Sequence, residues 1–574
     1  MRKLAAYLRP YLPAYLAAAL LIFIQVMSNL NLPRLMSEIV DKGIMVNDTA
    51  AIWRLGGWML LITLVASTSV ILASFLISRV AAGVATDLRN GVFRTLTYAS
   101  IEQMGRFGTA TLVTRTTNDI NQLQQFLVMS RMMLMAPLMG VGGIIMAISQ
   151  APSLAYVIFI VLALLFLIMG SAMLLALPQF KALQQKLDRL NLILREYLTG
   201  LRVIRAFAKS PVEMERFDKA NKDLTGTTLR VARIMVTLMP AMMFVMNASA
   251  ILIIWAGGLQ IEAGGIEIGS IMAFMQYVMM IMMNFLMLAM IFTFIPRAQV
   301  SARRILEILD SVNTVTNPPK TEKAPAGEAS LEFRNVCFRY AGAQEPVLKD
   351  ITFKARAGTT TAIIGGTGSG KSTLIDLIPR FYDIECGALL VHGQDVRRFA
   401  LKDLRESIAL VPQKPVIFSG TIADNIRYGR EEASPEEIRR AARIAQALEF
   451  IEKMEDGFES LVAQGGTNIS GGQKQRLSIA RAIAKNPDII IFDDSFSALD
   501  YETDSRLRKA LKEELQDKLI LVVAQRVSTI MDADQIIVLD QGEVAGIGTH
   551  KELFENNKVY REIVLSQMEE GEAA

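Results

Sequence analysis

The sequence predicts a membrane domain of six transmembrane helices with long cytoplasmic extensions, followed by a water-soluble α/β domain. The chain has 574 residues, which is long for one domain, and it combines 52% hydrophobic with 20% charged residues. Every uncharged run long enough to cross a membrane lies before residue 297. After residue 330, short apolar strands alternate with helical segments, as they do in α/β domains.

The uncharged runs give the positions of the spans. Each is long enough to cross the hydrocarbon core, which takes about 20 residues of α-helix. One run suffices for two crossings, and the turn-like residues 149–153 divide it. The runs are residues 10–33, 55–78, 132–180, 235–261 and 269–296, so that six spans are predicted. The first run is too long for a cleaved signal peptide, and we expect it to be a span.

Basic residues set the orientation of these spans, because short loops rich in Lys and Arg stay on the cytoplasmic side. Arginines recur through residues 79–131, between spans two and three, and residues 181–233, between spans four and five, are also basic. The turns near residues 149–153 and 262–267 carry no basic residue. We therefore expect both termini to be cytoplasmic.

Helical periodicity continues beyond the membrane in residues 79–98 and 181–207. At 1.5 Å per residue, about 20 further residues extend roughly 30 Å from the membrane. Short connectors near residues 102–109 and 209–217 would end these extensions, and we expect them to touch the soluble domain and transmit its motion. Residues 1–9 are predicted to form an amphipathic helix at the membrane interface.

Polar and methionine side chains in the spans indicate what the helices contact. Gln25, Asn29 and Asn31 are costly to expose to lipid, so they should face other helices or a cavity. Spans three, five and six are rich in methionine, whose flexibility lets a surface repack around varied apolar ligands. The methionines of span six surround the helix, so only some can line a cavity: Met272, Met275, Met279, Met280, Met282, Met283, Met287 and Met290.

Proline and glycine mark the boundary between the two parts. We predict a membrane domain over residues 1–310, a polar linker over 311–329 and a soluble domain over 330–570. Cys337 and Cys386 both lie in the soluble domain, where the cytoplasm keeps thiols reduced, so no disulfide is expected. The small net charge of +4 and the absence of a basic–aromatic stripe give no case for nucleic acid binding.

A phosphate-binding loop is the most specific motif. Its residues, in the pattern of Gly, four residues, then Gly-Lys-Ser, are Gly365, Gly366, Thr367, Gly368, Ser369, Gly370, Lys371, Ser372 and Thr373. The glycines let backbone N–H groups close around phosphates, Lys371 supplies positive charge, and the Ser372 hydroxyl can ligate Mg²⁺. A predicted strand at residues 360–364 precedes the loop and a helix start follows it, which predicts binding of a nucleoside triphosphate with Mg²⁺.

Four further motifs flank this loop. They are VCFRY ending at Tyr340, VPQ ending at Gln413, the strand IIIFD ending at Asp493, and SALD ending at Asp500. With the P-loop and the six spans that precede them, these motifs make essentially the whole chain resemble the half-transporters of the ATP-binding cassette (ABC) exporter family. The resemblance implies that Tyr340 stacks on the adenine of ATP, that Gln413 reaches Mg²⁺ or the attacking water, and that Asp493 holds the Mg²⁺ shell. It places Asp500 in a loop that crosses to a second ATP-binding domain.

The segment NISGGQ, residues 468–473, is similar to the family's signature motif, with Ile469 in place of the usual Leu. In the family this motif contacts the nucleotide held by the partner's P-loop, which implies a second subunit. The residues that would make this contact are Ser470, Gly471, Gly472 and Gln473.

Two catalytic positions depart from the family pattern. Asp494 stands where the family has Glu, and Gln525 stands where it has a switch His, while His392 and His550 lie elsewhere. Asp is one methylene shorter, which sets its carboxylate back by about 1.5 Å, and a misplacement of about 1 Å can cost on the order of 100-fold in rate. Gln cannot carry a proton as imidazole does. We therefore hypothesise that the site of this chain's P-loop, with Asp494, Gln525 and Gln413 at its catalytic positions, binds ATP but hydrolyses it slowly or not at all.

The resemblance therefore implies one subunit of a heterodimeric ABC exporter in a bacterial inner membrane, paired with a half-transporter that keeps the Glu and His. Its substrates are expected to be hydrophobic or amphipathic compounds such as drugs, and membrane lipids are expected to surround the spans. Two alternatives stay open: a lipid or peptide exporter of the same fold, and an ATP-gated regulatory or channel-like subunit. A lipid A-type substrate would favour a ring of Arg or Lys, which the uncharged runs lack.

Overall fold

The computed structural model describes residues 2–262, 264–320 and 329–567. The chain forms two compact units, one of Met1–Thr97 with Thr109–Ser311 and one of Tyr98–Gly108 with Val312–Ala574. Residues 321–328 of the predicted linker and the side chain of Met290 lie outside the described residues. The short segment Tyr98–Gly108 therefore belongs with the C-terminal unit, although it lies between two membrane helices in sequence.

The six predicted spans are confirmed, because the described residues of the first unit include six helices long and apolar enough to cross a membrane. The turn near residues 149–153 is also confirmed. The short N-terminal helix is α1 Arg2–Leu8. The helices that carry the spans are α2 Leu12–Ile39, α3 Thr49–Thr97, α6 Ile120–Gln150, α7 Ala155–Thr199, α9 Ser210–Glu262 and α10 Ile268–Leu309. The predicted extensions exist, because α3 continues to Thr97 and α7 to Thr199.

Short elements join these long helices at one end of the unit. The first predicted connector is confirmed as α4 (Ile101–Phe107), followed by α5 (Thr109–Thr114) and the π-helical turn Arg115–Asp119. The second connector was predicted too late in the chain. It is α8 (Leu201–Ala206), and residues from Ser210 onward already belong to α9. Only the short turn at residues 207–209 separates α8 from α9.

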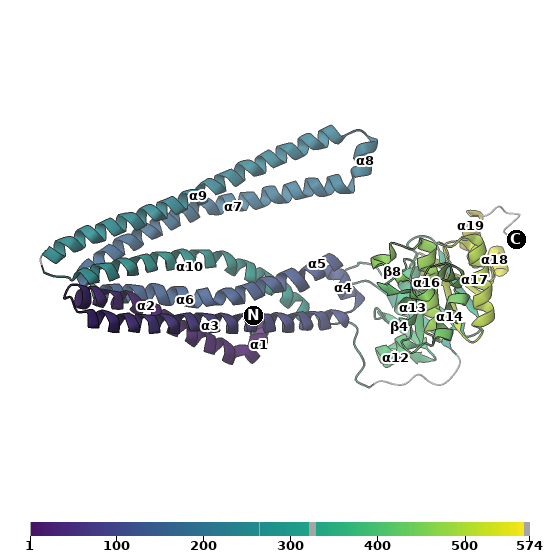
Figure 1. The fold of residues 1–574 in the computed structure, drawn as a ribbon. Coiled ribbons are helices and arrows are strands. Elements are labelled where there is room, and N and C mark those ends of the chain that lie inside the picture. Colours follow the sequence, from purple (N-terminus) through teal and green to yellow (C-terminus); the bar gives the residue numbers. More distant parts are fainter. Residues whose placement is uncertain (1, 263, 321–328, 568–574) are drawn as a thin grey trace. The chain divides into compact units, whose positions relative to one another are not determined.

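Within this unit, α2, α3, α6 and α10 pack against one another, while α7 and α9 form a separate long hairpin that diverges from them (Figure 1). Small residues allow close approach. A Cβ added at Gly142 would lie 2.4 Å from Leu30 Cδ1, and one at Gly143 would lie 3.0 Å from Ile281 Cγ1. Gln25 is buried as expected and its amide nitrogen contacts Met135 Sδ at 3.4 Å, which is a contact between helices.

The C-terminal unit is built on two main sheets. The antiparallel sheet has the order β2-β1-β4-β5, and the larger sheet has the order β12-β11-β3-β10-β9-β6, parallel except for β12. The strands are β1 Ser330–Phe338, β2 Leu348–Arg356, β3 Thr360–Gly365, β4 Cys386–Val391, β5 Gln394–Asp395, β6 Ile408–Val411, β9 Ile489–Asp493, β10 Leu519–Val523, β11 Gln535–Asp540 and β12 Glu543–Gly548. A short pair, β7 Gly420–Thr421 and β8 Leu461–Val462, stands apart.

Helices and the antiparallel sheet bury the two faces of the parallel sheet. Ile489 and Ile491 belong to one hydrophobic cluster, whereas Ile490 and Phe492 belong to the other, because successive side chains of a strand point to opposite faces. The helices are α11 Lys371–Leu377, α12 Leu401–Glu406, α13 Ile422–Arg427, α14 Pro435–Ile444, α15 Leu448–Glu452, α16 Gly471–Ala484, α17 Tyr501–Glu514, α18 His550–Asn556 and α19 Lys558–Leu565.

The expectation of two reduced cysteines is wrong in this structure. Cys337 on β1 and Cys386 on β4 are register partners and form a disulfide. The two residues are 49 positions apart in sequence, so that only the pairing of the two strands brings them together. The rule that cytoplasmic thiols stay reduced carries no information about which residues face each other across a sheet.

The close approach of α10 to α2 gives a stability prediction. A Cβ at Gly269 would lie 2.4 Å from the Ser37 carbonyl oxygen, and the Gly269 N–H donates to Asp41 Oδ1 at 2.7 Å. Gly269→Ala should therefore destabilise the solubilised protein by about 1–3 kcal/mol, because overpacking forces the backbone to shift. Thermal unfolding in detergent would measure this. The control is Gly140→Ala, where nothing lies within 4 Å of the added Cβ. Equal melting temperatures for the two variants would contradict this account.

Candidate functional site

The P-loop lies at the carboxyl end of β3, between β10 and β11 in the parallel sheet. Gly368 and Gly370 have φ values of 82° and 98°, in the left-handed region that glycine adopts without strain. At Gly365, a Cβ would lie 2.2 Å from the Leu539 carbonyl oxygen, so that no larger residue fits. Helix α11 then begins at Lys371. The predicted strand, loop and helix are confirmed, and the loop's backbone can close around an anion.

Lys371 is held by the loop itself. Its Nζ donates to the carbonyl oxygens of Gly365 at 2.8 Å and Gly366 at 2.7 Å. Burial lowers the pKa of Lys371, and the carboxylates of Asp494 and Asp493 act against that shift. The ammonium group therefore already sits beside the loop with opposite charges nearby, which is suitable for receiving phosphate oxygens.

Asp493 ends β9. It interacts with Asp494 and also with Asp376, a carboxylate that the sequence motifs did not reveal. Burial raises the pKa of Asp493, and the charge of Asp494 raises it further. Asp376, on α11, has its pKa raised to about 6, first by burial and then by Asp493. No regular motif marks Asp376, since its place depends on the packing of α11 beside β9. Asp376, Asp493 and Asp494 therefore form a negatively charged site next to the P-loop.

Three sequence motifs meet at one oxygen atom of Asp494. Its Oδ2 accepts hydrogen bonds from Gln413 Nε2 and from Gln525 Nε2, both at 3.0 Å. Asp494 also has a φ of 46°, which is uncommon for a residue other than glycine and recurs at functional sites. The adjacency of β6, β9 and β10 produces this meeting, because the three residues follow the carboxyl ends of these strands.

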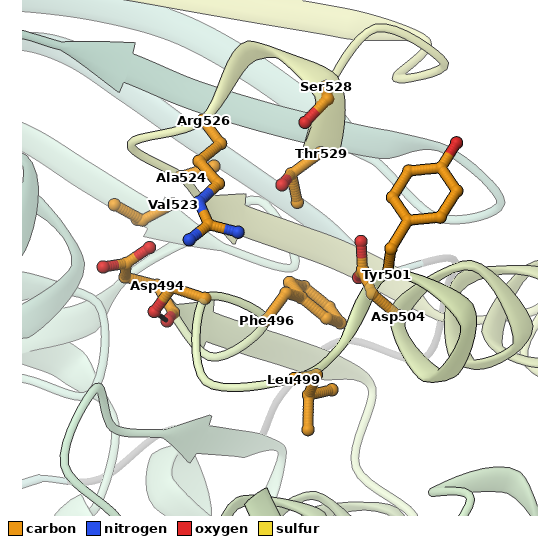
Figure 2. A pocket seen from close by; sticks show the side chains of 11 residues that line it. Asp494, Phe496, Leu499, Tyr501, Asp504, Val523, Ala524, Arg526, Ser528 and Thr529 are labelled. Carbon is orange, nitrogen blue, oxygen red and sulfur yellow. Dashed lines mark hydrogen bonds between the residues drawn. The ribbon is translucent and has the colours of Figure 1, made fainter.

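Cavities open beside this carboxylate. One of about 640 Å³ is lined by Gln413, Asp494, Ser497, Gln525, Arg526, Ser528 and Gln567. A smaller one, of about 60 Å³, has Asp494 and Arg526 at one end and Tyr501 and Asp504 at the other (Figure 2). The sequence motifs did not single out Arg526 or Gln567. The Gln567 side chain donates to the Gln525 carbonyl oxygen at 2.8 Å and accepts from the Val527 N–H at 2.9 Å, which fixes this segment.

Tyr340 lies close to the P-loop, in an aromatic cluster. Its hydroxyl is 3.0 Å from Thr373 Oγ1, and its ring makes edge contacts with Phe338 at 4.9 Å and Tyr382 at 5.3 Å between centroids. Tyr382 was not identified from the sequence, because a lone aromatic residue gives no pattern. Burial raises the pKa of Tyr382. The cluster offers the flat apolar surface on which a nucleotide base can stack.

The signature residues occupy a different place. Ser470 caps α16, where its Oγ accepts from the Gln473 N–H at 3.3 Å and its N–H donates to Gln473 Oε1 at 2.8 Å. Ser470 and Gly471 are exposed, so the start of this helix is open to an approaching ligand. Asp500 caps α17 through the Thr503 N–H at 2.9 Å. The structure therefore gathers the P-loop, Asp493, the two glutamines and Asp494, while the signature forms a second surface.

Comparison with known proteins agrees with this arrangement. Residues 15–285 match the model of the ABC transporter transmembrane region, and residues 348–497 match that of the ABC transporter. An uncharacterized ABC transporter ATP-binding protein of Mycobacterium tuberculosis is 41% identical over 569 residues, covering 98% of this chain and 97% of the relative.

Two further relatives carry functional names. An ATP-dependent lipid A-core flippase of Desulfotalea psychrophila is 31% identical over 491 residues, covering 85% of each chain. A multidrug efflux ATP-binding/permease protein of Mycobacterium tuberculosis is 34% identical over 486 residues, covering 85% of this chain and 40% of that protein. With six membrane helices and a P-loop α/β unit in one polypeptide, this chain belongs to the ABC transporter family.

Proposed function

We propose that this chain is one subunit of a heterodimeric bacterial ABC exporter, whose own P-loop site holds ATP but hydrolyses it slowly or not at all. The observation that carries the proposal is the pairing of one Asp494 oxygen with the amides of Gln413 and Gln525. The Asp494 side chain is one methylene shorter than Glu, and its two hydrogen-bond partners are neutral amides that cannot exchange a proton. An attacking water at this place would meet a displaced base and no imidazole.

The binding half of the site is complete by comparison. Glycine-built loop geometry, the Lys371 ammonium and the aromatic surface of Tyr340 supply contacts for phosphates and base. Position, rather than covalent chemistry, is most of what a protein contributes to phosphoryl transfer. A site can therefore retain tight nucleotide binding after losing the residues that orient water.

The residues present also fit Mg²⁺, an ion that prefers oxygen ligands. We assign the Ser372 hydroxyl, the Asp493 carboxylate and the Gln413 amide oxygen to hold it. The amide nitrogen of Gln413 faces Asp494, which leaves the amide oxygen for the ion. Burial raises the pKa of Asp493, so a cation would favour its ionised form. The bound ion would neutralise charge on the phosphate oxygens.

Two surfaces support a second subunit. The signature at the start of α16 is exposed, and the backbone N–H groups of this helix start suit the γ-phosphate of a nucleotide held by another chain. Beyond residue 180, where the uncharged run ends, the α7–α9 hairpin still exposes apolar side chains, which is typical of a protein interface. They include Leu192, Leu198, Val203, Phe207, Val212 and Met214. The proposed partner keeps the Glu and His that this chain lacks.

For substrate, we propose hydrophobic or amphipathic compounds such as drugs, exported from the cytoplasm or inner leaflet. The methionine-rich spans and the uncharged runs support this class, as does the relative named for multidrug efflux. The relative named as a lipid A-core flippase keeps a lipid substrate as the alternative. The basic cytoplasmic loops support an inner-membrane protein with both termini in the cytoplasm. Transport against a gradient into vesicles would rule out an ATP-gated channel-like subunit.

Restoring the family residues tests the degenerate site. We expect the purified chain alone to bind ATP with little turnover, and Asp494→Glu combined with Gln525→His to raise turnover at least tenfold, because both the base and the proton carrier return. Phosphate release and binding of a labelled ATP analogue are the measurements. Lys371→Ala is the control and should lose nucleotide binding. Vigorous, transport-coupled hydrolysis by the unaltered chain alone would defeat the proposal.

The signature gives a separate prediction for the complex with the partner. Ser470→Ala should lower the ATPase rate of the complex at least tenfold, because it removes a group that contacts the partner's nucleotide. Ser434→Ala is the matched control, since Ser434 also caps a helix with a capping box, at the start of α14. Its effect should stay within about twofold, as the loss of one cap costs only about 1 kcal/mol of stability. Equal rates for both variants would exclude the assigned role of Ser470.

A further inference from the structure

Helix α4 is held by polar contacts on the rest of the C-terminal unit, which carries the P-loop and is called the nucleotide-binding unit below. The Gln103 side chain donates to the Val312 carbonyl oxygen, and the Asn313 side chain donates to the Tyr98 carbonyl oxygen. Thr314 Oγ1 is 3.1 Å from Ser100 Oγ. Ser100 and Gln103 also form a capping box that fixes the first turn of α4. Residues 98–108 therefore belong to the same compact unit as the P-loop.

This docking brings a carboxylate from α4 into the aromatic cavity around Tyr340. The cavity, of about 200 Å³, is lined by Glu102, Thr314, Phe338, Arg339, Tyr340, Ala341, Tyr382 and Asp383. Thr314 Oγ1 donates to Glu102 Oε2 at 3.3 Å, which holds the carboxylate at the wall. Glu102 is thus the contribution of a segment between two membrane helices to a cavity of the nucleotide-binding unit.

The other charged groups of the cavity are already paired. Arg339 lies 3.3 Å from Glu385, and Asp383 accepts from Arg380 at 2.6 Å and 3.1 Å. Among the described residues of this unit, Glu102 forms no salt bridge within 4.0 Å, and its carboxylate accepts a hydrogen bond from the Thr314 hydroxyl. One carboxylate with remaining acceptor capacity therefore borders a cavity with aromatic walls.

A flat base that enters such a cavity stacks on an aromatic ring and turns its edge toward the wall. A carboxylate at the wall accepts hydrogen bonds and cannot donate them. Adenine presents an amino group at the 6-position of its ring, whereas guanine presents a carbonyl oxygen at that position. An acceptor facing the 6-position therefore attracts adenine and repels guanine.

We propose that Glu102 reads the base of the bound nucleotide by accepting a hydrogen bond from the 6-amino group of adenine. Glu102 is then a specificity-determining residue that lies on the connector between α3 and α5, outside the nucleotide-binding motifs. The inference rests on the proposed ATP-holding role of the P-loop site. It adds that base identity is sensed by the segment that links two membrane helices.

The test compares nucleotides that differ only in the base. The full chain, with its partner where the complex is stable, is titrated with the Mg²⁺ complexes of ATP, GTP and purine riboside triphosphate, which lacks the 6-amino group. Displacement of a ribose-labelled ATP analogue gives the dissociation constants. The unaltered protein should bind ATP about tenfold more tightly than purine riboside triphosphate, as expected for one charge-assisted hydrogen bond.

In Glu102→Ala that ratio should fall to about one, because the acceptor is gone. Glu102→Gln should weaken the preference for ATP over GTP, since its amide nitrogen can donate to the guanine oxygen. Glu332→Gln is the matched control. It removes the same charge from a residue that pairs with Arg334 and Lys354, and none of these three lines the cavity, so its ratios should stay unaltered.

The ratio, rather than the affinity, decides the result. If Glu102 only helps α4 to dock, its replacement weakens all three triphosphates equally and the ratios persist, which overturns the inference. A preference for GTP in the unaltered protein overturns it as well. Binding of ATP with ratios insensitive to Glu102 leaves the ATP-holding proposal standing, whereas an unaltered protein that binds none of the triphosphates overturns both.

Discussion

Burial of both faces of the parallel sheet is the constraint on which the nucleotide-binding unit depends. Strands β3, β9 and β10 supply apolar side chains to hydrophobic clusters on either side, which leaves little room for charged groups along their length. The functional groups lie instead at the strand ends, where Gly365, Gln525 and Asp493 come in this order, because β10 lies between β3 and β9. The site is thus a consequence of the core, because the buried parallel strands bring the P-loop backbone, the Asp493 carboxylate and the Gln525 amide to their common carboxyl end.

The sequence was sufficient wherever the signal is local. Uncharged runs revealed the six spans, and the glycine pattern at residues 365–373 revealed the loop that binds phosphate. It was insufficient wherever strand order decides. The meeting of Gln413 and Gln525 at Asp494 depends on β9 lying between β6 and β10, and the bond between the two cysteines depends on the register of β1 and β4. Neither sequence distance nor residue type contains that information.

The membrane unit illustrates the same division between local and non-local signals. Hydropathy located every span, because each helix that crosses the hydrocarbon core must be apolar and satisfy its own backbone hydrogen bonds. It did not reveal that α7 and α9 leave the other four helices as a hairpin, since that choice rests on which surfaces pack (Figure 1). The second connector was misplaced for a related reason. Only the turn at residues 207–209 separates α8 from α9, and so short a turn gives little local signal in the sequence.

The grouping of α4 with the C-terminal unit affects how this protein can be divided. The chain passes from the membrane unit to the nucleotide-binding unit at Tyr98, returns at Thr109, and passes over again at Val312. The two units are therefore interleaved in sequence, and no single cut separates them. A fragment that begins at residue 330 carries the P-loop and every conventional motif, yet leaves behind one wall of the cavity beside Tyr340. Studies on such an excised fragment would describe a cavity without Glu102 and Thr314, which line it in the whole chain.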